Sequence, residues 1–295
     1  MARTWTRDDV LVSTDWLQEH LDDDGVRILD CRYYFDGRDP VAIFRNGHIP
    51  GAVHFNWSTE LSDPNSSIDS MLAPAEQIEA AMSKVGLGDD TRVIAYDDEG
   101  GHFAARVWLA LARYGKEDQL RILDGGWVKW EAENRPVSKE TTTVEPASFT
   151  IDRSGGRPDI IATADDVLAA TKDGKTKILD VRRMSEFVGE EVRAKRGGRI
   201  PTSEYLFWQD NLNWNRDRSF KTNDEIHAVN QEAGIEEETP VITYCQGGVR
   251  AALSALSLWM TGVKSVRVYD GSWAEWGNRD DLPIETGPAK QEKAS

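Results

Sequence analysis

Six short hydrophobic runs, rich in Val and Ile, recur along the chain at 26–31, 92–97, 120–124, 176–181, 240–245 and 265–270. Each run is apolar at successive positions, so both of its faces are apolar, as in the strands of a buried parallel sheet. Segments with helical periodicity lie between the runs. This alternation predicts an α/β fold in which helices cover both faces of a mostly parallel sheet.

Helix-end signals support this alternation. Pro74 begins a helical segment over 75–85, and Gly86 ends it. Thr222 and Glu225 have the spacing of a capping box, in which each side chain binds the backbone N–H of the other residue. A further segment with helical spacing runs from 251 to 260.

The chain also contains one internal repeat. Four motifs recur in the same order, with equivalent residues about 150 positions apart. The pairs are Val26-Arg-Ile-Leu-Asp30-Cys-Arg32 with Lys177-Ile-Leu-Asp180-Val-Arg182, Gly47-His-Ile-Pro50 with Gly198-Arg-Ile-Pro201, Val93-Ile-Ala-Tyr96 with Val241-Ile-Thr-Tyr244, and Leu123-Asp-Gly-Gly-Trp127 with Tyr269-Asp-Gly-Ser-Trp273.

Two similar α/β domains follow from the repeat. We expect the first at 1–136 and the second at 159–286. Residues 137–158 lack a helical period and are rich in Thr, Pro and Gly, so we interpret them as a linker. The polar end of the chain, 287–295, is expected to be a flexible tail.

Composition narrows the function classes. The 295 residues include 35 Lys and Arg against 51 Asp and Glu, for a net charge of −16, which disfavours nucleic acid and anionic membranes as partners. No apolar stretch is long enough to span a bilayer, and the first ten residues lack the apolar run of a signal peptide, so we expect a cytoplasmic protein.

Two cysteines, Cys31 and Cys245, exclude a disulfide framework and a zinc site built mainly from thiolates.

Candidate chemistry lies where the two copies differ. After Tyr96 the first copy continues with Asp97-Asp-Glu-Gly-Gly-His-Phe, whereas after Tyr244 the second continues with Cys245-Gln-Gly-Gly-Val-Arg250. Open α/β sheets bind ligands beyond the carboxyl ends of their strands, which is where Cys245 is expected. The helix over 251–260 would begin directly beneath this loop.

The loop has the features of an anion site. Gly247 and Gly248 allow a tight turn in which successive N–H groups converge above the positive end of the helix dipole. Such settings favour the thiolate, the reactive form of cysteine. Arg250 adds a positive charge that could bind a two-oxygen group with both arms. The alternative is a buried structural cysteine.

With these motifs, over nearly its whole length, the chain resembles the rhodanese family of sulfurtransferases in its tandem-domain form. The resemblance rests on Leu29-Asp-Cys-Arg32, Leu179-Asp-Val-Arg182, Gly47-His-Ile-Pro-Gly-Ala52, Asp124-Gly-Gly-Trp127, Asp270-Gly-Ser-Trp273 and the loop Cys245 to Arg250. It implies an active site in the second domain that faces the first, and a first domain without the nucleophile. Asp97 in place of the cysteine fits that pattern.

The resemblance implies a mechanism. Cys245 would attack the outer sulfur of a small anionic donor, thiosulfate or 3-mercaptopyruvate, and carry it as a persulfide to cyanide, a low-molecular-weight thiol or thioredoxin. Neither a metal nor an organic cofactor is required. Gln246, Gly247, Gly248, Val249 and Arg250 would bind the substrate together with Arg182, whose alternative role is a salt bridge with Glu186 or Glu190.

Other basic residues and the second cysteine have less specific roles. Arg193, Lys195, Arg196 and Arg199 either line the donor entrance or form a solvated loop. Arg32 and Arg106 are expected to be structural, and Cys31 to occupy the core position that Val181 holds in the second copy.

This chain departs from the family in two places. Gly198-Arg-Ile-Pro-Thr202 replaces the usual Gly-His-Ile-Pro-Gly of the second domain. The cysteine loop resembles neither the thiosulfate type, Cys-Arg-Lys-Gly-Val-Thr, nor the mercaptopyruvate type, Cys-Gly-Ser-Gly-Val-Thr. We favour thiosulfate as the donor because Arg250 could supply the missing cation.

Two other classes of function are open at this point. A sulfur-carrier or interaction module without turnover would also have this fold. Related dual-specificity phosphatases use a cysteine loop that ends in arginine, but theirs encloses five residues whereas Cys245 and Arg250 enclose four. The shorter loop suits a sulfur atom better than a tetrahedral phosphate.

Overall fold

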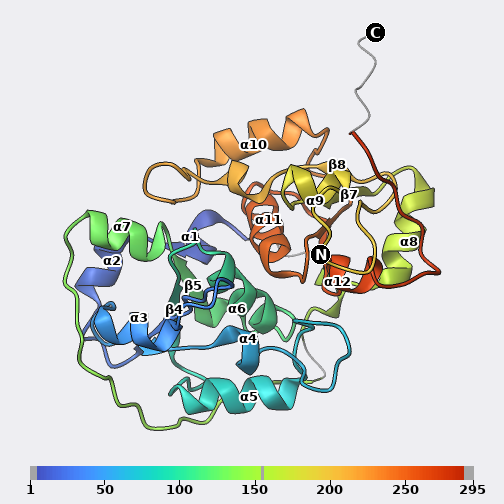
Figure 1. Cartoon of the computed structure of the whole chain (residues 1–295). Coiled ribbons are helices and arrows are strands. Elements are labelled where there is room, and N and C mark those ends of the chain that lie inside the picture. Colours follow the sequence, from blue (N-terminus) through green and yellow to red (C-terminus); the bar gives the residue numbers. More distant parts are fainter. Residues whose placement is uncertain (1–4, 154–155, 289–295) are drawn as a thin grey trace.

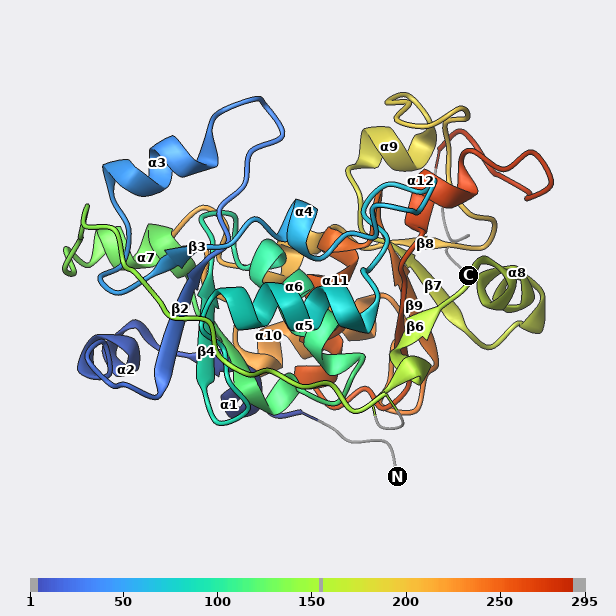
Figure 2. The ribbon, with the colours of Figure 1, turned by 90° about the horizontal axis from the view of Figure 1, so that it is seen from below.

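The computed structural model describes residues 5–153 and 156–288, which form two five-stranded sheets (Figures 1 and 2). The strand orders are β1-β5-β4-β2-β3 in the first sheet and β6-β10-β9-β7-β8 in the second. All pairings between these strands are parallel. Equivalent strands occupy equivalent places, so the repeat found in the sequence is a repeat of topology.

The six hydrophobic runs form the central strands. These are β2 (Val26–Asp30), β4 (Arg92–Tyr96), β5 (Leu120–Leu123), β7 (Lys177–Asp180), β9 (Val241–Tyr244) and β10 (Val266–Tyr269). Four strands were not anticipated, namely β1 (Leu11–Val12), β3 (Val53–His54), β6 (Ile161–Ala162) and β8 (Glu204–Tyr205). They form the sheet edges, and two residues are too few for a periodic pattern.

Helices flank both sheets. In the first half they are α1 (Arg7–Val10), α2 (Thr14–Glu19), α3 (Pro40–Asn46), α4 (Trp57–Glu60), α5 (Ala75–Lys84), α6 (His102–Ala112), the 3₁₀ helix η1 (Glu117–Gln119) and α7 (Gly126–Ala132). In the second half they are η2 (Pro158–Ile160), α8 (Ala164–Asp173), α9 (Met184–Val188), η3 (Trp208–Asn211), α10 (Asn223–Glu232), α11 (Val249–Met260) and α12 (Ser272–Trp276). The helices expected from end signals are α5 and α10, and the one expected from helical spacing is α11; the capping box of Thr222 and Glu225 is formed.

The two domains share one hydrophobic core. Figure 2 shows α6 and α11 in the centre of the molecule, between the two sheets. All residues of α6 are buried, and a single apolar cluster includes residues of both helices. Trp5, Trp108 and Trp259 meet within it, with ring centroids 4.9–5.6 Å apart. Cys31 is also in this cluster, as predicted.

The predicted linker crosses the first domain without helix or strand over its described residues up to 157. Ser138 pairs with His48, and the Ala147 N–H donates to the Ser83 carbonyl at 3.0 Å. The domain boundaries expected from the sequence stay predictions. In the predicted tail the Gly287 N–H donates to the Val188 carbonyl, whereas 289–295 lie outside the described residues.

Each domain extends one loop onto the other. The loop that follows α4 in the first domain reaches the end of β10, where the Leu72 N–H donates to Asp270 at 2.8 Å. Asp270 also forms a buried ion pair with Arg106 of α6, with 2.6 Å between the nearest atoms. In the reverse direction the Phe220 N–H of the second domain donates to Asp124 at 2.8 Å. These contacts place the loop after α4 against the Cys245 loop.

Candidate active site

A cleft of about 640 Å³ lies between the domains, at the carboxyl end of the second sheet. The second domain lines it with Arg183, Arg193, Phe207, Trp208, Gln209, Cys245, Gln246, Gly247, Val249, Arg250 and Ala274. The first domain lines it with Tyr33, Phe35, Trp57, Ser58, Ser62, Asp69, Ser70, Glu99 and His102. The structure therefore brings Cys245, Gln246, Gly247, Val249 and Arg250 together around one cavity, whereas Gly248 and Arg182 are not among the lining residues.

Cys245 follows β9 directly and is a free thiol, 1% exposed. Gly248 has φ +76°, in the left-handed region that favours glycine, and α11 begins at the next residue. The first N–H groups of a helix have no carbonyl partner within it, so the start of α11 presents donors beneath the loop. Gly247 does not have positive φ, and an added Cβ would lie 3.4 Å from Ser70 of the first domain.

Ser272 holds the two ends of the loop together. Its hydroxyl accepts hydrogen bonds from the N–H groups of Cys245 and Gly248, both at 3.1 Å, and donates to the Tyr269 carbonyl at 2.7 Å. This geometry requires φ +48°, which is uncommon for a residue with a side chain. The first copy has Gly126 at the equivalent position. Ser272 is therefore one of the positions at which the two copies differ, and this difference could have identified it from the sequence.

The corresponding loop of the first domain, which is one residue longer before its helix begins, surrounds an acidic side chain. Asp97 takes the place of the cysteine, and its carboxylate accepts four backbone N–H bonds of 2.8–3.1 Å from residues 99, 101, 103 and 104. Burial raises the pKa of Asp97, while these four bonds act in the opposite direction. This loop architecture can therefore surround a negatively charged group with N–H donors.

Arg250 is held by Glu186 of α9. Its guanidinium donates to both carboxylate oxygens, at 2.9 and 3.2 Å, and Glu186 is fully buried. Burial by itself would raise the pKa of Glu186, but the hydrogen bonds and charge of Arg250 lower the pKa to about 2. Arg250 therefore brings a fixed positive charge to the loop, and the two-armed contact expected for a ligand is made with Glu186.

Arg182 does not reach the cleft. Its guanidinium donates to Asp180 at 2.6 and 2.9 Å and to the Gly198 carbonyl at 2.7 Å, and it lies 4.6 Å from the ring of Trp273. Arg32 makes the same set of contacts with Asp30, Gly47 and Trp127 in the first domain. The ion pair of Arg182 is therefore with Asp180, not with Glu186 or Glu190, and a contact of Arg182 with a donor has no geometric support.

The basic run of the second domain divides between two roles. Arg193 lines the cleft, 3.7 Å from Glu186. Lys195 pairs with Asp280, and Arg196 donates to several backbone carbonyls near the end of α12. Arg199 is buried and donates to the Gly287 carbonyl.

The first-domain wall of the cleft was not predicted from the sequence. His102, at the start of α6, is 6% exposed and has its Nδ1 atom 2.8 Å from the Glu99 carbonyl oxygen. Burial lowers the pKa of His102 to about 4, so the ring is neutral at pH 7. Neither His102 nor the aromatic residues beside it share a motif spacing with Cys245, and no sequence signal connected them.

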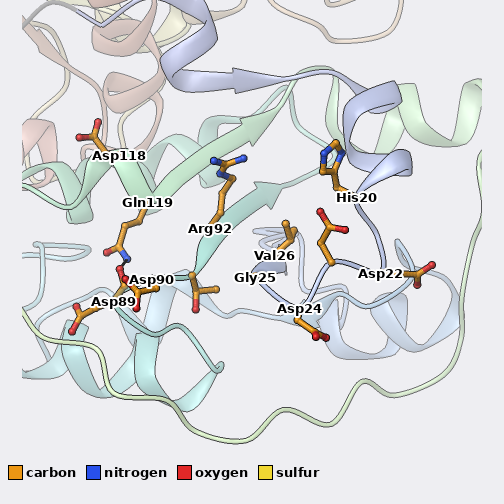
Figure 3. Close-up of a pocket in the computed structure, with 12 residues that line it drawn as sticks. His20, Asp22, Asp24, Gly25, Val26, Asp89, Asp90, Arg92, Asp118 and Gln119 are labelled. Carbon is orange, nitrogen blue, oxygen red and sulfur yellow. Dashed lines mark hydrogen bonds between the residues drawn. The ribbon is translucent and has the colours of Figure 1, made fainter.

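A second recess, of about 750 Å³, lies at the amino ends of β2 and β4. Figure 3 shows Arg92 at the start of β4, with Asp22, Asp24, Asp89 and Asp90 on the surrounding loops. It contains no cysteine. Within the described residues, no group of three or more His, Cys, Asp and Glu side chains is placed to hold a metal ion, and no helix is long and apolar enough to span a membrane.

The comparisons with known proteins agree with this architecture. The family model of the rhodanese-like domain matches twice, at 13–133 and 163–279. The chain is 33% identical to the 3-mercaptopyruvate sulfurtransferase of Escherichia coli over 97% of this chain and 99% of that protein. It is 34% identical to a candidate thiosulfate sulfurtransferase of Mycolicibacterium smegmatis, over 95% and 99%. It is also 33% identical to the sulfur carrier protein TtuD of Thermus thermophilus, over 95% and 97%.

A solved structure gives the same result. The crystal structure of SseA from Escherichia coli, a 3-mercaptopyruvate sulfurtransferase, superimposes with a TM-score of 0.79 at 32% identity, over 92% of this chain and 100% of that one. With two family domains that cover most of its length, the chain belongs to the rhodanese family of sulfurtransferases.

Proposed function

We propose that this protein transfers a sulfane sulfur from a small anionic donor to a thiophilic acceptor through a persulfide on Cys245. One observation carries the proposal. Cys245 is a free thiol that lines the cleft, and the loop that follows it leads through Gly247 and Gly248 into the N-terminus of α11. The N-terminus of α11 and the nearby Arg250 would stabilise both a thiolate and a persulfide anion at this position.

In the first half-reaction the Cys245 thiolate attacks the outer sulfur of the donor. A bond forms between Sγ and that sulfur, the bond to the rest of the donor breaks, and sulfite or pyruvate leaves with the electron pair. Gln246, Gly247, Gly248 and Val249 form the loop around the transferred sulfur. Arg250 and Arg193 supply positive charge beside it, which supports an anionic donor.

We propose thiosulfate as the donor, with 3-mercaptopyruvate as the alternative. The positive charge of Arg250, Arg193 and Arg183 on one wall of the cleft favours the dianion. Relatives that match nearly the whole chain include a 3-mercaptopyruvate sulfurtransferase and a candidate thiosulfate sulfurtransferase.

For the acceptor, we propose cyanide or a small thiol, either of which a cleft of about 640 Å³ can admit, and we include thioredoxin. Because the mechanism needs a free thiol, we place the activity in a reducing compartment such as the cytoplasm.

The experiment that tests this proposal follows the mass of Cys245. Incubation with thiosulfate or 3-mercaptopyruvate, without acceptor, should add one sulfur atom to the peptide that contains Cys245. Cys245→Ser should abolish both this mass increase and turnover. Cys31→Ser is the matched control, because burial raises the pKa of Cys31 and keeps it out of the chemistry. Near wild-type turnover in Cys245→Ser, or added mass on Cys31, would contradict the proposal.

A sulfur-carrier function is the second candidate, supported by the similarity to TtuD over most of the chain. A carrier would load Cys245 but pass its sulfur efficiently only to a protein partner. Steady turnover with cyanide or small thiols as acceptors therefore distinguishes the enzyme from the carrier. Hydrolysis of para-nitrophenyl phosphate serves as the control for phosphatase activity.

A further inference from the structure

The two walls of the cleft differ in their charge. The second domain lines the cleft with three arginines, of which Arg193 and Arg250 pair with Glu186 and Arg183 pairs with Glu191. The lining residues of the first domain include no lysine or arginine and have two carboxylates, Asp69 and Glu99, instead. Arg250 also acts electrostatically on His102 across the cleft, so the negative character of the first-domain wall rests on its two carboxylates.

His102 presents an unused hydrogen-bond acceptor on the first-domain wall. Its Nδ1 lies 2.8 Å from the Glu99 carbonyl oxygen, which can only accept, so Nδ1 carries the proton. In the neutral ring Nε2 is then an acceptor, and it has no hydrogen-bond partner among the described residues. Contacts with the rings of Phe103 and Trp208, at centroid distances of 3.9 and 4.8 Å, hold the ring in place.

The two carboxylates add negative charge to the same wall. Asp69 is exposed and forms no hydrogen bond or ion pair through its side chain within the described part of the chain. Glu99 has Arg218 at 3.7 Å, which balances its charge in part. Of the two, Asp69 is therefore the carboxylate with its full charge available to a ligand.

Aromatic rings complete the wall. Phe35 is 70% exposed, an unusual position for a large apolar side chain, and its ring centroid lies 5.1 Å from that of Tyr33. Tyr33 in turn lies 5.3 Å from Trp57. The faces of such rings attract cations, and the exposed ring offers apolar surface to the carbon chain of a ligand.

Resting on the function proposed above, we propose that the first-domain wall is an acceptor subsite that selects thiols carrying an ammonium group. His102 Nε2 and Asp69 receive the N–H groups of the ammonium, and Tyr33, Phe35 and Trp57 pack against its carbon chain. The thiol sulfur then attacks the outer sulfur of the Cys245 persulfide. The S–S bond to Sγ breaks, its electron pair stays on Cys245 as the thiolate, and the thiol proton passes to water.

Three small thiols of similar size but different charge test this subsite: cysteamine, 2-mercaptoethanol and 3-mercaptopropionate. Cys245 is first loaded with donor, or with inorganic polysulfide if neither donor loads it, and the second-order rate constant of discharge is measured for each thiol. The variants are Asp69→Asn and His102→Phe, the second of which keeps a ring between Phe103 and Trp208. Asp90→Asn, in the recess of Figure 3, and His227→Phe, on the exposed face of α10, are the matched controls.

The ratio of the cysteamine rate to the 2-mercaptoethanol rate should fall about two- to fivefold in Asp69→Asn, as expected for one partly screened charge. It should fall about tenfold or more in His102→Phe, which removes an acceptor for a charged donor. The 3-mercaptopropionate rate should rise in Asp69→Asn, and neither control should change the ratios. Comparison between variants cancels the intrinsic reactivity of each thiol.

Ratios that stay at wild-type values in both variants, on protein with normally loaded Cys245, would overturn the subsite and leave the persulfide mechanism intact. A protein in which Cys245 accepts sulfur from neither donors nor polysulfide would instead overturn the proposed function, and the subsite with it. The mass of the Cys245 peptide separates these two results.

Discussion

Ser272 shows how one hydroxyl can shape a reactive loop. It accepts hydrogen bonds from the Cys245 and Gly248 N–H groups and so holds the two ends of the loop together. Because the first copy, with Asp97 in place of the cysteine, has glycine at this position, the serine accompanies the cysteine within this chain.

We expect Ser272→Gly to slow sulfur loading of Cys245 about tenfold or more, because the hydroxyl and its three hydrogen bonds, of roughly 1 kcal/mol each, are lost. Glycine tolerates the positive φ, so the variant should fold, with a stability lowered by the lost hydrogen bonds. Single-turnover loading, followed by mass, measures the effect, and thermal unfolding is the control. Loading at the wild-type rate would show that the loop keeps its shape without the hydroxyl.

The ion pair between Arg250, which lines the cleft, and the buried Glu186 predicts how stability depends on acid. Because the pKa of Glu186 is about 2 in the folded protein and its ordinary value is 4.5, the pair stabilises the fold fully above pH 4.5. That stabilisation is lost as the pH falls from about 4.5 toward 2. Glu186→Gln should cost about 3 kcal/mol or more at pH 7, because Arg250 would be left buried without its counter-charge.

Urea unfolding of wild type and Glu186→Gln between pH 3 and 7 tests this prediction. The difference in the free energy of unfolding should shrink as the pH is lowered. A difference independent of pH would mean that the carboxylate charge of Glu186 does not contribute to stability.

At the scale of single elements, the turn before β8 contains a measurable strain. Thr202 has φ +65°, whereas the equivalent Gly51 has φ +78° in the first domain. A β-branched residue is disfavoured in this region. Thr202, which stands where the family pattern has glycine, therefore adopts the same left-handed turn conformation as Gly51 and is strained in it.

Thr202→Gly should raise the free energy of unfolding by about 1 kcal/mol, since relief of left-handed strain exceeds the entropy that glycine adds to the unfolded chain. Gly51→Thr in the first domain is the reciprocal variant and should lower stability by a similar amount. Chemical denaturation of both measures the effect. Equal stability of wild type and Thr202→Gly would show that the turn bears no net strain.

At the scale of the whole molecule, the two domains are expected to unfold together, because one apolar cluster extends through both. Trp108 of α6 contacts Trp259 of α11 and Trp5 at the centre of this cluster. Trp108→Ala should cost about 3–5 kcal/mol, as for other large core residues truncated to alanine. Calorimetry should show one transition at a lower temperature. Two separate transitions would contradict a shared core.

Much of the fold could be read from the amino-acid pattern. Buried parallel strands are apolar on both faces, so the six central strands appeared as continuous runs, and the motifs of the repeat assigned them to two domains. The Cys245 loop was found in the same way, since a strand, a glycine pair and a helix are local features. The two-residue edge strands were missed because they are too short to carry a pattern.

The rest depended on tertiary structure, because a sequence position does not specify where a side chain points. Arg182 and Arg250 are both arginines near the end of a strand, but Arg182 turns inward to Asp180 while Arg250 lines the cleft. His102 and Phe35 reach the site only because α6 packs against α11 and brings the first domain to the second. The sequence by itself determined the local elements and the cysteine that we propose as the nucleophile, and the packing of the two domains decided which residues face it.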